Sequence, residues 1–168
     1  MTLKRLLLVG VAGVILIAPL PGAAAGQTPK ALVITAYNVT AESAGGRDTK
    51  AVARPGDVIR YTLVFTNTQP TPVKDVQFVD PIPQGLVYVL GSAAAHERTR
   101  IEYSIDGGKT YATEPLIAVV EGGKKVEKPA PREMYTHVRW TVLSSVAPGA
   151  QVTAELRTQV KTAPGDAK

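Results

Sequence analysis

The chain has no cysteine among its 168 residues. It can therefore form neither a disulfide nor a lipoprotein attachment, and a zinc site would lack its thiolate ligands. Only two histidines are present, His96 and His137, and neither has neighbours that would complete a metal-binding motif. The sequence predicts no metal centre of the zinc type.

Catalytic motifs are absent as well. The sequence contains no nucleophile elbow, no phosphate-binding glycine loop and no Ser/His/Asp arrangement. Glycoside hydrolysis needs two carboxylates about 5–10 Å apart, and no spacing singles out a pair among the six that stand beside predicted turns or strand ends. These are Asp57, Asp75, Asp80, Glu102, Asp106 and Glu114. We predict that the chain is not an enzyme and has no cofactor or metal site, although loop oxygens of Asp75, Asp80 and Asp106 could converge on calcium.

Long hydrophobic runs are confined to the N-terminus. The basic pair Lys4 and Arg5 precedes the apolar run Leu6–Leu20, which ends shortly before the small residues Ala23–Ala25. This order is typical of a secretory signal peptide, so we predict that residues 1–25 are cleaved off after the last alanine. The alternative is an uncleaved anchor, because about 20 apolar residues can cross a bilayer. Export to the periplasm or the medium of a bacterium follows, with no membrane span after cleavage.

The predicted mature chain is small and weakly basic. Removing residues 1–25 from 168 leaves 143 residues, which is one ordinary domain. The net charge of +5 includes two cations of the signal, so the remainder carries +3, and nucleic acid is not an expected partner. Four cations share one loop with Glu127 and Glu133, namely Lys124, Lys125, Lys128 and Arg132. We interpret this loop as solvated; contact with an acidic polymer or an anionic surface is the alternative.

Alternation of apolar and polar residues dominates from Ala31 onward, and this period of two is typical of strands with one wet face. The residues expected to point inward are, strand by strand, Leu32, Ile34 and Ala36; Ile59, Tyr61, Leu63 and Phe65; Val76 and Phe78; Leu86 and Tyr88; Val138, Trp140 and Val142; and Val152, Ala154, Leu156, Thr158 and Val160. They predict a core that contains the single tryptophan.

Turn residues separate these runs. Pro55-Gly56 and Pro148-Gly149 are turn dipeptides, and Asp106-Gly107-Gly108 predicts a hairpin between Ile101–Ile105 and Thr110–Tyr111. About seven to eight short antiparallel strands result. We therefore predict an all-β, immunoglobulin-like antiparallel β-sandwich over residues 26–161, followed by a flexible tail over residues 162–168.

Three segments are predicted to be irregular. Ala41–Arg54 is a polar connection that could hold a short edge strand at Thr49–Ala53, and Gly91–Arg100 is an alanine-bearing loop. Gly122–Glu133 is the longest polar insertion and predicts a mobile lobe or a hairpin tip.

Several motifs together resemble a known family. PGDVIRYTLVFTN from Pro55, VKDVQFVDPIPQGLVYVLGSA from Val73, VRWTV from Val138 and VAPGAQVTAELRTQV from Val146 are similar to the conserved-repeat domain of bacterial surface proteins, a domain of unknown function. Asp80, Pro81, Pro83, Gly85 and Leu86 match its D-x-x-P-x-G-L exit. The resemblance covers residues 33–160 and implies an immunoglobulin-like sandwich in exported, often envelope-associated proteins. The family usually forms tandem arrays, whereas this sequence carries a single copy behind its predicted signal.

The segment Ser104–Tyr111, SIDGGKTY, resembles the Asp box of sialidases and other secreted β-proteins. In such boxes the Asp and Ser side chains bond the turn backbone and the aromatic ring packs beneath, as Asx-turn chemistry also predicts. A structural role is therefore expected here.

The sequence favours an exported, non-enzymatic structural or protein-interaction module of the cell envelope. Its partner would be an envelope protein, and self-association through edge strands is open, because unpaired edges accept strands. The apolar strand Leu32–Tyr37 could pair in its own sheet or be donated to a neighbour. The alternative function is a carbohydrate- or ligand-binding secreted β-sandwich, with a periplasmic chaperone as a third hypothesis. Sugar binding would depend on exposed aromatic rings, and the candidates are Tyr88, Tyr103, Tyr111 and Tyr135.

Overall fold

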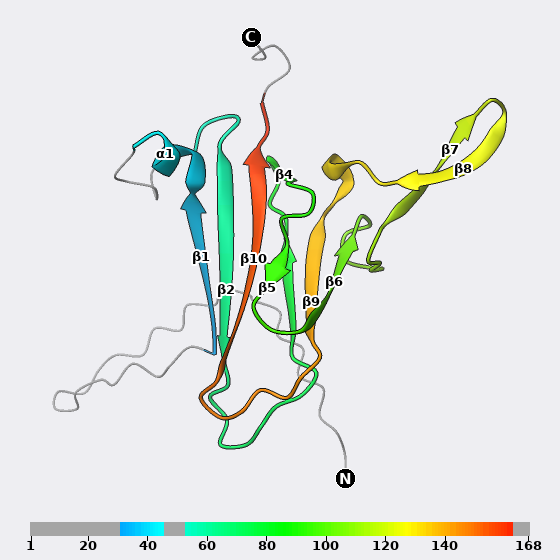
Figure 1. The fold of residues 1–168 in the computed structure, drawn as a ribbon. Helices are drawn as coiled ribbons and strands as arrows, with labels where there is room; N and C mark the ends of the chain where they lie inside the picture. The colour runs from blue at the N-terminus through cyan, green and yellow to red at the C-terminus, as the bar shows by residue number, and fades with distance from the viewer. Residues whose placement is uncertain (1–30, 46–52, 163–168) are drawn as a thin grey trace, which may run out of the picture.

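The computed structural model describes residues 31–45 and 53–162, and almost all regular structure within these ranges is β (Figure 1). Ten strands form antiparallel sheets, and helix is limited to α1 (Val39–Ser43) and the short 3-10 turn η1 (Arg132–Met134). The prediction of an antiparallel, mostly β fold is confirmed, with ten strands in place of seven to eight. The predicted signal peptide and nearly all of the predicted tail lie outside the described residues, as does most of the segment Thr49–Ala53.

The largest sheet has five strands. Its bounds are β1 (Leu32–Asn38), β2 (Val58–Thr66), β10 (Gln151–Val160), β4 (Leu86–Tyr88) and β5 (Ala94–Ala95). The order is β1-β2-β10-β4, and β5 also pairs with β10. Leu63 of β2 lies between Ile34 of β1 and Ala154 of β10, which sets the register across the sheet. The strand Leu32–Tyr37 thus pairs in its own sheet, which is one of the two predicted arrangements.

Two further sheets complete the described part. The three-stranded sheet has the order β3-β9-β6, formed by β3 (Gln77–Pro81), β9 (His137–Val142) and β6 (Thr99–Ser104). The two-stranded sheet pairs β7 (Leu116–Glu121) with β8 (Lys124–Pro129) and extends away from the other two sheets in Figure 1. The hairpin tip predicted within Gly122–Glu133 is confirmed at Gly122-Gly123, and the rest of this segment forms β8 and the start of η1.

Buried side chains from both larger sheets form one hydrophobic cluster. Its members are Leu63, Phe65, Val76, Phe78, Tyr88, Val138, Trp140, Val142, Val146, Val152, Ala154 and Leu156. Trp140 is fully buried, and its indole Nε1 donates a hydrogen bond to the carbonyl of Ala94 over 3.1 Å. The alternation predicted for β2, β9 and β10 is confirmed by this cluster, because the inward set of each strand supplies its members.

The predicted burial of β1 is wrong for Ile34 and Ala36, whereas Leu32 is partly buried and packs against the cluster. Ile34 and Ala36 share the core side of the sheet with their partners Leu63 and Tyr61, yet Ile34 is 46% exposed and Ala36 is exposed as well. β1 is the outermost strand of the largest sheet, so no described strand covers this side of it completely. The alternation in the sequence correctly predicts which side of β1 is directed toward the core. Whether that side is buried depends on which strands of the other sheet lie opposite it.

Three local predictions also need correction. Gly91–Arg100 is not a plain loop, because it contains β5 and the start of β6. Ala41–Arg54 begins inside the one-turn helix α1, which Asn38 caps by accepting a hydrogen bond from the backbone N–H of Ala41 over 2.9 Å. The predicted strand partner Thr110–Tyr111 is reduced to a single bridge between Tyr103 and Ala112, because the backbone N–H of Thr110 bonds the Asp106 side chain.

Candidate functional site

The β7–β8 hairpin is the most exposed regular element among the described residues, and we call residues 116–129 the arm. Its strands pair only with each other, and its base is closed where the backbone N–H of Ala130 donates to the carbonyl of Pro115 over 2.8 Å. Every residue of β8 is exposed, and Val120 of β7 is 69% exposed. An isolated two-stranded hairpin is only marginally stable in water, so the arm displays apolar groups without support from the core.

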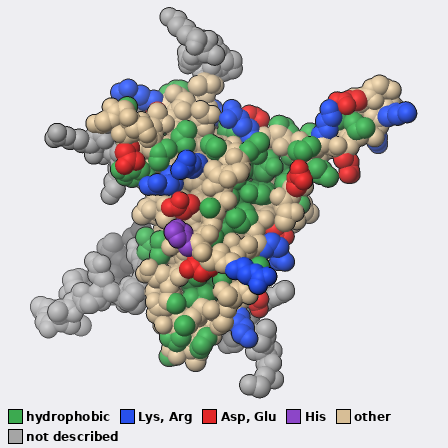
Figure 2. Space-filling view, in the orientation of Figure 1, with side chains coloured by type: hydrophobic (Ala, Val, Ile, Leu, Met, Phe, Trp, Pro, Cys, Tyr) green, Lys and Arg blue, Asp and Glu red, His purple; other side chains and the backbone are tan. Residues whose placement is uncertain are grey.

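The two strands of the arm differ in character, because β7 is apolar up to Glu121 and β8 is mostly charged. Figure 2 shows basic, acidic and hydrophobic side chains side by side on it. Lys128 forms an ion pair with Glu121, while the register places Val119 opposite Val126. Three of the four clustered cations therefore belong to a β-hairpin rather than to an irregular loop. One of them is neutralised within the arm, which leaves a surface of mixed polarity suited to a protein partner.

The Asp-box segment builds its own turn, as predicted. The Asp106 carboxylate accepts hydrogen bonds from the Thr110 hydroxyl over 2.6 Å, from the backbone N–H of Thr110 over 3.0 Å and from the Ser104 hydroxyl over 2.7 Å. These donors, those of Thr110 first, hold the pKa of Asp106 well below its ordinary value. The backbone N–H of Gly108 donates to the Ser104 hydroxyl over 2.9 Å. The side chain of Asp106 thus holds the local structure of the turn.

The ring of Tyr111 packs beside this turn, under the guanidinium of Arg139. Arg139 lies 4.0 Å from the ring centroid and also donates to one oxygen of Glu102 over 2.9 Å. Burial is the main cause that raises the pKa of Tyr111. The Asp-box turn is therefore joined to β9 and β6 by a stack in which Tyr111 packs on Arg139 and Arg139 pairs with Glu102.

Two neighbouring glycines give a direct test of this packing. Gly107 and Gly108 both have positive φ, but a Cβ on Gly107 would meet nothing within 4 Å, whereas one on Gly108 would lie 3.2 Å from the Tyr111 hydroxyl. We expect Gly107→Ala to cost about 1–2 kcal/mol of unfolding free energy from backbone strain alone. We expect Gly108→Ala to cost more, because Tyr111 and His137 must shift too. Urea unfolding of both variants measures the difference; equal losses would show that the ring does not pack on the turn.

The tyrosines proposed for sugar stacking face one another instead. The ring centroids of Tyr88, Tyr103 and Tyr135 lie 5.3–5.4 Å apart, and the Tyr88 hydroxyl donates to that of Tyr103 over 3.2 Å. Burial, followed by the Tyr88 hydrogen bond, raises the pKa of Tyr103. Tyr88 is fully buried and the other two are half-buried. The described residues therefore offer no open aromatic platform from this set.

Three of the six candidate carboxylates are engaged in hydrogen bonds or ion pairs. Asp57 accepts hydrogen bonds from the backbone N–H of Arg54 and from the Asn38 side chain, and these lower its pKa. Glu102 pairs with two arginines, and Asp106 with its own turn. Within residues 31–45 and 53–162 no group of three His, Asp or Glu side chains could hold a metal ion. The predicted calcium alternative through Asp75, Asp80 and Asp106 is therefore not supported.

Asp80 differs from the other five. It is only 8% exposed in β3, and no hydrogen bond to its carboxylate forms within the described part of the chain. Burial raises its pKa to about 6. The sequence contains a signal for this position, because Val76, Phe78 and Asp80 alternate along one buried face, whereas the exit motif and the neighbouring turn predict an exposed carboxylate.

Comparison of the chain with family models, with curated proteins and with solved structures finds no match. In the part of the chain that the structure describes, no helix has the length and apolar character to cross a membrane.

Proposed function

We propose that this chain is an exported, non-enzymatic structural or protein-interaction module of a bacterial cell envelope. In this proposal the two larger sheets are the layers of an immunoglobulin-like β-sandwich, and the chain is a single-copy relative of the conserved-repeat domain. The signal-like order of Lys4, Arg5 and Leu6–Leu20 supports export. The hydrophobic cluster that both larger sheets share supports the sandwich.

The observation that carries the interaction role is the projecting arm. Natural proteins rarely expose apolar strands away from the core without a use for them. The arm presents Leu116 and Val120 on one face, and it holds charges of both signs around them. We infer that the arm docks against a protein of the envelope, with the apolar residues at the centre and the lysines at the rim.

Photo-crosslinking in living cells tests this role. A photoreactive phenylalanine analogue in place of Val120 is expected to join the chain to a discrete envelope protein, in the periplasmic or secreted fraction. The same analogue in place of Ser144, an exposed loop residue far along the chain from the arm, is the control and is expected to give no such product. Recovery of the chain only in the cytoplasm would contradict export, and equal crosslinking from both positions would contradict docking through the arm.

A truncated arm provides a matched loss-of-function variant. Leu116 pairs directly with Pro129, so residues 117–128 can be replaced by an Asn-Gly turn that suits a tight hairpin. The crosslinked partner is expected to be lost in pull-down from this variant. Its thermal midpoint is expected to stay within a few degrees of the parent, because the arm contributes no member of the core cluster.

A further inference from the structure

The largest sheet ends in a strand edge that no other described strand covers. β1 pairs only with β2. The backbone N–H of Thr66 donates to the carbonyl of Ala31 over 2.8 Å, so alternate residues counted from Ala31 bond to β2. The peptide groups of Leu32, Ile34 and Ala36 consequently point toward the free edge. Such an edge has the donors and acceptors that a further strand would need.

The other edges of the two larger sheets are protected. The backbone N–H of Val142 donates to the carbonyl of Val76 over 2.9 Å, so Pro81 occupies a free-edge position of β3 and offers no N–H there. β4 and β5 have three and two residues, and β6 is partly covered by the bridge from Tyr103 to Ala112. β1, with the sequence LVITAYN, has seven residues and neither charge nor proline. It lacks the devices by which edge strands normally avoid a partner.

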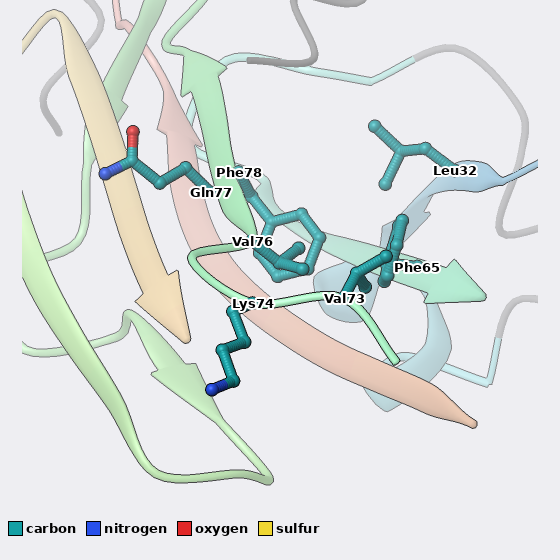
Figure 3. A pocket seen from close by; sticks show the side chains of 7 residues that line it. All are labelled: Leu32, Phe65, Val73, Lys74, Val76, Gln77 and Phe78. Atoms are coloured by element: carbon teal, nitrogen blue, oxygen red, sulfur yellow. The ribbon is translucent and has the colours of Figure 1, made fainter. Parts of the chain in front are cut away.

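A small apolar groove lies beside this edge, between the start of β1 and the segment that leads into β3. Figure 3 shows its lining. Leu32 and Phe65 contribute from the largest sheet, and Val73, Val76 and Phe78 contribute from the β3 side, where the polar side chains of Lys74 and Gln77 complete it. Its volume of about 20 Å³ is room for about one water molecule. The groove is thus too small for a sugar ring or for a whole aliphatic side chain, but a side chain from a strand that lies along β1 can pack against its apolar rim.

Asp80 lies further along the same flank. It is two residues after Phe78, so both side chains point to the same face of β3. Its charge contributes, after burial, to the raised pKa of Tyr61, and Tyr61 pairs with Ala36 of β1. Ala36, the β1 partner of Tyr61, is small and exposed. The carboxylate of Asp80 has no hydrogen-bond donor among the described residues, yet neither of its oxygens is among the fully buried atoms without a partner, so water or the cation of a partner can reach it.

We propose that the flank between β1 and β3 binds an extended segment of a partner protein, which adds to the β1 edge and places a lysine or arginine against Asp80. This inference rests on the proposed interaction role and names a second surface with its recognition chemistry. Residues of the added strand opposite Leu32, Ile34 and Ala36 are spaced by two. The recognised pattern is therefore apolar-x-apolar-x-basic, in either chain direction, with the basic residue level with Ala36.

Binding of synthetic peptides to the protein, purified in the form in which it is recovered from cells, tests this proposal directly. The probes are fluorescent peptides of about nine residues that alternate valine and threonine and carry one lysine at the predicted position, in both directions. One control replaces the lysine by methionine, and a second carries N-methyl groups on the amides that would face β1. We expect the lysine peptide to bind about tenfold more tightly than the methionine peptide and the N-methylated peptide not to bind. The absence of binding by every peptide would overturn the proposal.

Three variants assign the binding to this flank. Asp80→Asn is expected to remove the preference for lysine over methionine. Ile34→Lys is expected to abolish binding of both peptides, whereas Val33→Lys, an equally exposed position on the opposite face of β1, is expected to leave it unchanged. Equal effects of the two lysine substitutions would overturn the proposal. So would a dimer of this chain that forms through β1 and dissociates in the Ile34→Lys variant but not in the Val33→Lys variant. Loss of arm crosslinking with intact peptide binding would contradict only the proposed role of the arm.

Discussion

Replacement of Trp140 by alanine is expected to lower the free energy of unfolding by about 3–5 kcal/mol, the range for truncating a large aromatic residue in a core. Trp140 is fully buried in the central strand of the three-stranded sheet. The substitution removes the ring from the shared cluster and also leaves the carbonyl of Ala94 without its indole donor. Since single domains are stable by only about 5–15 kcal/mol, a loss of this size affects the entire fold.

Hydrogen exchange on this variant tests more than its stability. If both larger sheets belong to one cooperative sandwich, amides in β2 and β10 lose protection together with those in β9. Val120→Ala, in the exposed arm, is the control and is expected to change the free energy of unfolding by less than about 0.5 kcal/mol. Retained protection in β10 alongside lost protection in β9 would show that the two sheets unfold separately and would contradict the sandwich.

Replacement of Asp80 by asparagine is expected to stabilise the protein at neutral pH. The folded-state pKa of Asp80 is raised from 3.8 to about 6 because the carboxyl is buried. The native state therefore binds its proton more tightly than the unfolded chain does, and stability falls as pH rises from about 4 to about 6. At about 1.4 kcal/mol for each pKa unit, the charged form costs roughly 3 kcal/mol above pH 6. Asparagine has a similar shape and does not ionise, so it avoids this cost.

Urea unfolding at a series of pH values measures this effect. Asp80→Asn is expected to exceed the parent in stability by up to about 3 kcal/mol near pH 7.5, and the difference is expected to vanish near pH 4. Asp75→Asn, on an exposed loop residue before β3, is the matched control and is expected to stay within about 0.5 kcal/mol at both pH values. A parent that is more stable than Asp80→Asn at pH 7.5 would show that the carboxylate has a favourable partner within the chain.

The two experiments on Asp80 have a common logic. Where a destabilising side chain lies in a functional surface, a substitution that stabilises the protein commonly costs function. A basic residue of a partner would stabilise the charged carboxylate, and part of the cost at neutral pH would then be recovered on association. The stability of Asp80→Asn and its loss of lysine preference are therefore expected to occur together.

Sequence reasoning predicted the central strands well and the periphery poorly. β2, β9 and β10 have neighbours on both sides, so their alternation directly reports which residues are buried. β1 alternates in the same way, yet Ile34 is exposed because the sheet ends there. Coverage of an outer strand is a property of the tertiary arrangement, and a period of two cannot report it.

Short elements were missed for a different reason. β5 has two residues and α1 has five, too few to establish any period. The Asp-box turn was predicted correctly because its donors and acceptors are close in sequence, from Ser104 to Thr110. Asp80 shows the opposite situation: its position on a core-facing row could be read, but its lack of a hydrogen-bond partner depends on strands distant in sequence.

The two larger sheets can accept few additional strands. Pro81 blocks the free edge of β3, whereas β1 is uncharged and contains no proline. A building block that propagates a fibre by edge pairing needs two receptive edges, one for each neighbour. These sheets offer one long receptive edge, so the addition of a single strand saturates them. Two copies joined through β1 would likewise form a closed pair and leave nothing to extend. In edge pairing through these two sheets, the described part of the chain is therefore a terminus rather than a link.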